Sequence, residues 1–380
     1  MPPSPATIAA VSRRAFSLTE LLVAMTIALM VMAGIAQLFG IYGRSLSGSQ
    51  ATVELSGRMR AGAWQLRKDL GGVTCDVVPW LAPEADAGYF EYIEGPRNDR
   101  NQPTSNARHG TADLVADIDD VLLFTTRSLG EPFSGPVPGG GTAESEYAEV
   151  AWFCGPMAVQ PVAGLTMHNL YRRQLLVAAV PGAGVFGSAA SSNAGTALPF
   201  STRIGTDGRT RPNSLGDLTR RENRFLHAAA PPYRFLDATA PGAMLTGDQE
   251  GDDVVLTNVI AFDVRGFDPQ VGGVGGPGGY IDLATGALAP TAALAATPQA
   301  GSGLATATAT QTAVYDTWST HYAFMANPAV NPSGINDQSA YTTSPPYNVP
   351  LRGLEVRIRC YEPASKQVRQ VTIRHSFVRK

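Results

Sequence analysis

The sequence predicts an α+β fold, with one long N-terminal helix followed by a domain of antiparallel strands. Two observations carry this prediction. The stretch from Leu21 to Gly43 is uncharged and mostly apolar, and apolar residues then recur at three- or four-residue steps as far as Leu70, which is the spacing of a helix. From Cys75 onward the chain changes to short β-branched and aromatic runs between loops, which is typical of strands.

Composition narrows the class of protein. The 380 residues are 44% hydrophobic, enough to bury a sizeable core. A net charge of -3 gives no case for nucleic-acid binding. Only 16% of residues are charged, while 40 are Gly and 28 are Pro, which favours a loop-rich extracytoplasmic domain over a helical enzyme.

The first segment is long and apolar enough to cross a membrane. Leu21–Gly43 spans 23 residues and lies between the charges of Glu20 and Arg44. A helix of that length reaches roughly 34 Å, which exceeds a bilayer core. An ordinary secretory signal has a shorter apolar run. That alternative stays open because Ser45-Leu46-Ser47 is an acceptable small-x-small cleavage site.

Glu20 is the informative residue at the start of this segment. An ionised carboxylate next to a membrane-spanning helix costs about 2 to 3 kcal/mol unless it has a partner. A cut between Ala15 and Phe16 would place a new amino group four residues before Glu20, on the same helical face. Processing would therefore create a cation for Glu20, within the subunit or from a neighbour.

Ala15-Phe16-Ser17-Leu18-Thr19-Glu20-Leu21-Leu22-Val23-Ala24 resembles the cleavage and methylation signal of type IV prepilins and pseudopilins, although Ala15 stands where that family usually has Gly. The resemblance implies that a prepilin peptidase cuts after Ala15 and methylates the amino group of Phe16. It also implies that Glu20 guides filament assembly. The helix contacts that we expect during assembly are Phe16, Leu18, Leu21, Leu22 and Val23.

The resemblance implies a pilin-like fold and a domain order. Residues 1–15 would be a leader, 16–43 the transmembrane and filament-core helix, 44–72 its amphipathic continuation and 73–380 a periplasmic β-rich head. The protein would be a single-pass inner-membrane protein with a periplasmic C-terminal domain, and would join a filament after processing.

The amphipathic continuation is expected to pack one face against the head. Its apolar residues recur at helical steps, and the Gly71-Gly72 pair is expected to end the helix. The residues of the predicted buried face are Val53, Leu55, Met59, Ala63, Leu66 and Leu70.

The head is expected to contain eight strands. The final two form the clearest pair, because Leu354, Val356, Ile358 and Cys360 alternate with polar residues and predict a hairpin with one buried face. The predicted strands are Tyr89–Glu94, Val121–Arg127, Tyr147–Phe153, Leu170–Ala178, Val254–Phe267, Tyr322–Met325, Leu354–Tyr361 and Val368–Val378.

The C-terminal half is similar to J-type minor pseudopilins of type II secretion and to W-type minor pilins, in the segments Leu256–Asp268 and Pro350–Ile358. The J-type resemblance implies a tip complex that primes a periplasmic pseudopilus. Its partners would be other minor and major pseudopilins, the inner-membrane assembly platform and, before assembly, lipid. The W-type alternative is a minor pilin that serves adhesion, motility or DNA uptake.

Catalytic motifs are not found in the sequence. It has no GxSxG, HExxH or phosphate-binding loop, so we expect no catalytic residue, cofactor or metal. The five histidines are isolated in sequence, and His375 alternates with apolar neighbours, which favours a core residue. An anchored periplasmic hydrolase or binding protein remains the alternative from another class.

Two acidic stretches and three cysteines complete the candidate sites. The acidic stretches precede strands and are interpreted as solvated turns, with calcium binding left open because they lack EF-hand spacing. In an oxidising compartment Cys154 and Cys360 are the candidate disulfide, with Cys75 left over. The acidic residues are Asp113, Asp117, Asp119 and Asp120, then Asp248, Glu250, Asp252 and Asp253.

Overall fold

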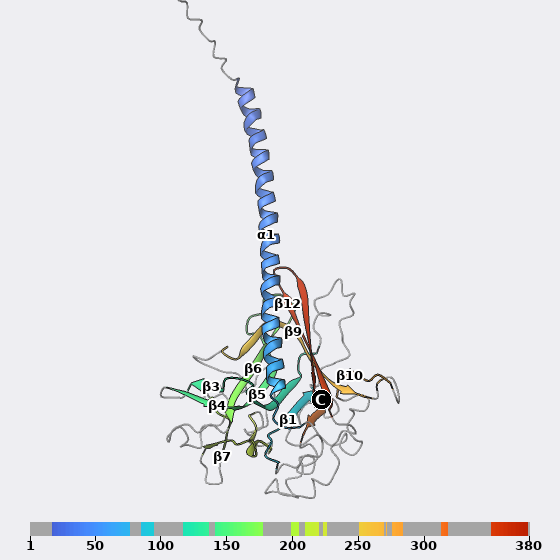
Figure 1. Ribbon diagram of the computed structural model, residues 1–380. Helices are drawn as coiled ribbons and strands as arrows, with labels where there is room; N and C mark the ends of the chain where they lie inside the picture. Colours follow the sequence, from blue (N-terminus) through green and yellow to red (C-terminus); the bar gives the residue numbers. More distant parts are fainter. Residues whose placement is uncertain are drawn as a thin grey trace, which may run out of the picture. The chain divides into compact units, whose positions relative to one another are not determined.

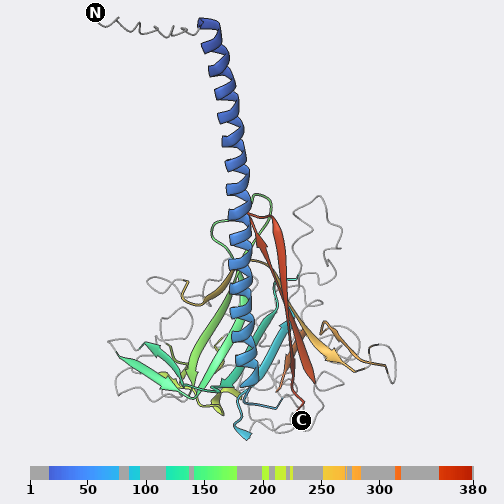
Figure 2. The same cartoon turned by 45° about the horizontal axis from the view of Figure 1, so that its top comes forward.

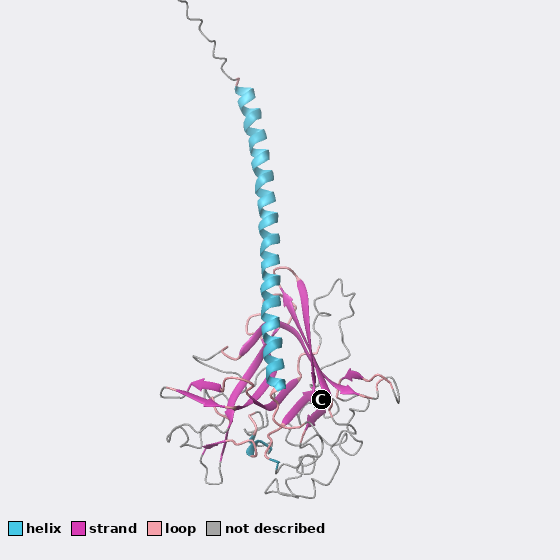
Figure 3. Cartoon of the chain, in the orientation of Figure 1, coloured by secondary structure: helices cyan, strands magenta, loops and turns pink. Residues whose placement is uncertain are grey.

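The structure is a computed structural model and confirms the α+β prediction, with a long apolar helix and a large antiparallel sheet (Figures 1 and 3). It forms two compact units, Met1–Val53 and Glu54–Lys380, which are described separately. The residues described are 17–76, 85–94, 117–136, 141–177, 199–204, 210–219, 223–225, 251–269, 271, 276–283, 313–317 and 351–378.

The first unit contains the N-terminal part of helix α1 (Leu18–Gly71). By length and composition, α1 is the one helix in the described part of the chain that can cross a membrane. Its apolar side chains in this unit are exposed, as shown by Met30 at 80% and Phe39 at 74%. This surface is suited to lipid or to other apolar helices.

The second unit is built on an antiparallel sheet of nine strands in the described residues. The strand order is β11-β1-β2-β5-β6-β9-β12-β13, and β10 pairs with β9. Figure 2 shows the longer strands of this sheet from a second direction. The strands are β1 (Phe90–Glu94), β2 (Val121–Arg127), β5 (Tyr147–Pro156), β6 (His168–Val177), β9 (Val254–Asp268), β10 (Gly279–Ile281), β11 (Ala313–Asp316), β12 (Gly353–Glu362) and β13 (Gln367–Ser376).

Three smaller elements flank this sheet. Strands β3 (Phe133–Pro136) and β4 (Thr142–Ser145) form one hairpin, and β7 (Thr202–Ile204) and β8 (Thr210–Pro212) form another. The short 3-10 helix η3 (Asp217–Thr219) follows β8.

The C-terminal part of α1 packs on one face of the sheet. The predicted helix face is buried at Leu55, Met59, Ala63, Leu66 and Leu70, which join the main core with side chains of β2, β5, β9 and β12. The helix ends at Gly71, as expected. A Cβ on the next residue, Gly72, would lie 2.1 Å from the carbonyl oxygen of Arg127.

The prediction was wrong for Val53, which is 73% exposed. Leu55 follows it by two residues, a rotation of about 200° around a helix, so the two side chains point to opposite faces. Leu55 is buried against the sheet, and Val53 is exposed.

The other face of the sheet has its own core, which contains Phe153 and Tyr171 of β5 and β6, stacked with ring centroids 5.4 Å apart. The segment after β8 covers part of this face through Leu218 and Phe225. Between them in the sequence, Arg224 is fully buried and donates from Nη1 to Glu91 Oε2 at 2.9 Å.

Seven of the eight predicted strands are confirmed, with boundaries within three residues of β1, β2, β5, β6, β9, β12 and β13. The eighth, Tyr322–Met325, lies outside the described residues. The short strands β3, β4, β7, β8, β10 and β11 were not predicted, since three or four residues carry too little periodicity to be recognised.

Candidate functional site

The start of α1 is a capping box, in which a residue before the helix and a carboxylate three residues later satisfy each other's main-chain donors. Ser17 N donates to Glu20 Oε2 at 3.1 Å, and Glu20 N donates to Ser17 Oγ at 3.2 Å. The first helical bond runs from Leu21 N to Ser17 O at 3.1 Å. In this monomer, therefore, Glu20 is engaged by its own chain.

The predicted assembly residues form an exposed surface around this cap. Leu18 is 78% exposed, and Leu21, Leu22 and Val23 lie between 54% and 57%. Ala15 and Phe16 lie outside the described residues, so the amino group that would pair with Glu20 is not placed. The processing and assembly roles of these residues remain predictions.

The chain matches the family model of the prokaryotic N-terminal methylation motif over residues 11–36, a stretch that includes the predicted cleavage site and Glu20. Searches of curated proteins and of solved structures give no match. Together with the helix and sheet, the motif defines a type IV pilin-like protein. The motif also implies processing by a prepilin peptidase.

A buried ion pair holds the end of α1 on the sheet. Asp69 is 1% exposed and accepts three hydrogen bonds from the sheet, from Arg172 Nε and Nη2 of β6 at 2.7 and 2.9 Å and from Trp152 Nε1 of β5 at 2.9 Å. Gln65 Nε2 of α1 adds a fourth at 3.1 Å. The bidentate geometry makes this an orientation-specific contact, which sequence periodicity did not reveal.

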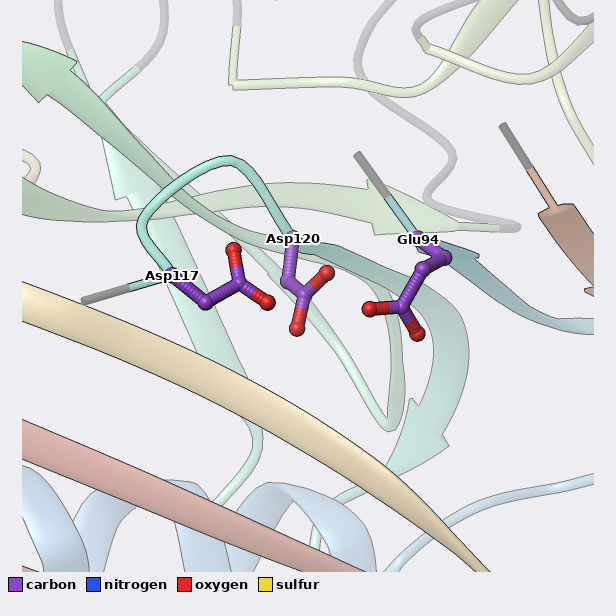
Figure 4. Close-up of side chains that lie close together, drawn as sticks. All are labelled: Glu94, Asp117 and Asp120. Atoms are coloured by element: carbon purple, nitrogen blue, oxygen red, sulfur yellow. The ribbon is translucent and has the colours of Figure 1, made fainter. Parts of the chain in front are cut away.

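A second site lies where β1 ends and β2 begins. Glu94, Asp117 and Asp120 are buried, and each offers a carboxylate oxygen within 4.8 Å of the other two (Figure 4). The β1–β2 register pairs Ile93 with Val121, so Glu94 follows opposite Asp120. Three carboxylate oxygens at this separation are the ligand type that calcium and magnesium take in proteins.

Hydrogen bonds orient the carboxylates in this cluster. Asp120 Oδ2 accepts from Val264 N at 2.6 Å, and Glu94 Oε2 accepts from Leu283 N at 3.2 Å and from the Tyr92 hydroxyl. Burial raises the pKa of Asp120 well above its ordinary value, and the charges of Asp117 and Glu94 raise it further, while the bond from Val264 N opposes them. The cluster thus favours the protonated form of Asp120.

The interpretation of the first acidic stretch as a solvated turn was wrong. Asp117, Asp119 and Asp120 are at most 6% exposed, because the chain before β2 lies beside β9, where Phe262 N donates to Asp117 O at 2.8 Å. Asp113 lies outside the described residues. Sequence reasoning also missed Glu94, although pairing the predicted strands Tyr89–Glu94 and Val121–Arg127 brings it to this place.

Burial differs between the described residues of the second acidic stretch. Asp252 is exposed, as a solvated turn requires, but Asp253 is 6% exposed, so the interpretation was wrong for that residue. The remaining two members, Asp248 and Glu250, lie outside the described residues.

The three cysteines are free thiols in the structure. The Cys154–Cys360 disulfide therefore stays a prediction for oxidised protein. Burial raises the pKa of Cys360 to about 12. His375 is partly buried against Phe377, with ring centroids 4.9 Å apart, and burial lowers its pKa.

Proposed function

We propose that this protein is a minor pseudopilin subunit of a type II secretion system. Its N-terminal helix would join other pseudopilins in the complex that primes a periplasmic pseudopilus. The protein would act as an assembly subunit without enzymatic activity. Before assembly it would lie in the inner membrane with the domain after α1 in the periplasm.

The observation that carries the proposal is the methylation motif over residues 11–36 on a helix whose apolar side chains are exposed. An apolar surface of this length is stable only against lipid or other apolar helices. Leaving the membrane therefore requires a replacement surface, which the apolar helices of neighbouring subunits supply. Glu20 would exchange its Ser17 partner for the amino group of a neighbour.

The first experiment is intact-mass analysis and N-terminal sequencing of the full chain expressed with and without a prepilin peptidase. We expect a mature chain that begins at N-methylated Phe16 only when the peptidase is present. An N-terminus near Ser47 or Gly48, or an uncut chain under both conditions, would remove the proposal and favour a simple membrane anchor.

A matched pair of variants separates processing from assembly. Glu20→Ala is expected to be cleaved after Ala15 but to fail to enter a filament, whereas Thr26→Ala, a nearby exposed helical position whose Oγ1 bonds only to Val23 O, should do both. Normal filament entry by Glu20→Ala would refute the assembly role.

The machine is identified by deleting the gene in its source organism. Loss of exported enzymes with intact surface pili is the expected result. Loss of pili or twitching with normal secretion would instead assign the protein to a type IV pilus.

A further inference from the structure

The last strand of the sheet, β13, has one edge that pairs with no other strand in the described part of the chain. In the described residues it pairs only with β12, over ten consecutive positions from Gly353↔Ser376 to Glu362↔Gln367 and without a register shift. The edge strand at the other end of the sheet, β11, has only four residues. Long, regular edge strands are uncommon because an open edge invites pairing with another chain.

The hydrogen bonds of the hairpin show which main-chain groups face outward. Phe377 N donates to Arg352 O at 2.9 Å, so these two residues form a hydrogen-bonded pair. Such pairs alternate along an antiparallel ladder, which directs every second residue of β13 away from β12. The residues with outward N–H and C=O groups are Val368, Gln370, Thr372, Arg374 and Ser376, all of which have exposed side chains.

Most of the usual protections of an edge strand are missing along β13. It contains no proline and no bulge, and its ten residues exceed the very short strands that commonly protect an edge. The remaining protection is charge. Residues 353–378 contain five basic and two acidic residues, so two copies of this edge would repel each other.

The charge on this hairpin is incompletely balanced. On the face of the sheet opposite α1, Glu355 pairs with both Arg357 and Arg374. The neighbouring Arg359 donates from Nε to the neutral side chain of Gln370 at 2.7 Å and forms no ion pair with a described residue. A carboxylate on a strand beyond Gln370 would lie two strands from Arg359, within reach of its long side chain.

We propose that the open edge of β13 binds an extended segment of another protein, which adds a strand to the sheet and carries acidic side chains opposite Arg359 and Arg374. Main-chain hydrogen bonds to the five outward residues would supply affinity, and the positive charges of Arg359 and Arg374 would supply specificity. This inference is independent of the proposed function, since it requires neither cleavage nor filament formation.

The test uses the full chain in detergent micelles and three fluorescent ten-residue peptides. The first alternates Thr or Val with Glu, the second has Lys in place of Glu, and the third is the Glu peptide with N-methylated amides along one edge. We expect the Glu peptide to bind at least tenfold more tightly than either of the others. Fluorescence anisotropy measures the dissociation constants.

Two substitutions at one position then locate the site. Thr372→Pro removes an outward N–H and leaves the β12 ladder intact, since proline is tolerated where the N–H faces solvent. Thr372→Val keeps that N–H and is the control. Thr372→Pro should weaken the Glu peptide at least tenfold, Thr372→Val should bind like wild type, and Arg359→Gln should weaken binding severalfold.

Several results would overturn the proposal. They are equal binding of the Glu and Lys peptides, equal binding of the N-methylated peptide, or no binding of the Glu peptide at 1 mM. Self-association that Thr372→Pro abolishes would assign the edge to a second copy instead of an acidic partner. If Thr372→Pro unfolds, as circular dichroism would show, the N-methylated peptide still decides the question because it leaves the protein unchanged.

Discussion

The buried pair between Asp69 and Arg172 gives the sharpest stability prediction. Asp69→Asn removes the negative charge that receives both Arg172 donors and the Trp152 indole N–H. The side chains of Asp69 and Arg172 are 1% and 13% exposed, so the Arg172 guanidinium would remain desolvated without its counter-charge. Removing one partner of a buried pair costs about 3 to 5 kcal/mol.

The exposed pair of Glu54 and Arg58 on the same helix is the matched control. Its side chains are 63% and 57% exposed, and an exposed i,i+4 pair contributes only about 0.3 to 0.5 kcal/mol. Glu54→Gln should therefore leave the free energy of unfolding almost unchanged.

Thermal unfolding of the full chain in detergent, followed by tryptophan fluorescence, separates the two variants. A loss of about 3 kcal/mol corresponds to a fall in Tm of roughly 6 to 12 °C. A double-mutant cycle with Arg172→Ala should give a coupling energy above about 1 kcal/mol. If Asp69→Asn lowers Tm no more than Glu54→Gln does, the pair does not hold the helix and this reasoning fails.

Three further predictions follow from burial. Because the folded-state pKa of Asp120 is raised, the protonated carboxyl stabilises the fold below its unfolded pKa of about 3.9, and this stabilisation is lost as pH rises through the folded-state pKa. Denaturant unfolding from pH 4 to 8 should show the loss of stability, and Asp120→Asn should reduce that loss. Gly72→Ala should destabilise the folded protein by about 1 to 3 kcal/mol, since the added Cβ meets the Arg127 carbonyl oxygen. A Cβ at Gly57 would have no atom within 4 Å, so Gly57→Ala should stabilise the helix by about 0.5 to 1 kcal/mol. Equal Tm shifts for the two variants would contradict this contrast. With its pKa raised to about 12, the thiol of Cys360 should resist iodoacetamide at pH 8 until the protein unfolds, and mass spectrometry showing rapid alkylation of folded protein would refute its burial.

Local patterns were sufficient to predict α1 and the longer strands. The period of the helix identified Leu55 to Leu70 as its buried face, and alternation identified the β12–β13 hairpin. Both patterns repeat often enough to exceed the noise of single residues. Extending the helical pattern back to Val53 failed, because Val53 is only two residues from Leu55 and a two-residue step turns a side chain to the opposite face of a helix.

The sites in the head were beyond such patterns. Asp69 and Arg172 are far apart in sequence and meet only because α1 lies across β5 and β6. Glu94 and Asp120 meet through strand pairing, which acidic spacing alone does not reveal. An acidic stretch before a strand is usually solvated, and here the main-chain contact between the stretch and β9 reverses that expectation.

The position of Asp69 also bears on how tension would travel through the molecule. A pull along the axis of α1 would reach the sheet at Arg172 and Trp152, on β6 and β5. Each of these strands has a neighbour on both sides, so pulling either one out of the sheet would require breaking two hydrogen-bonded ladders. The ion pair therefore joins the helix to interior strands and not to an edge of the sheet.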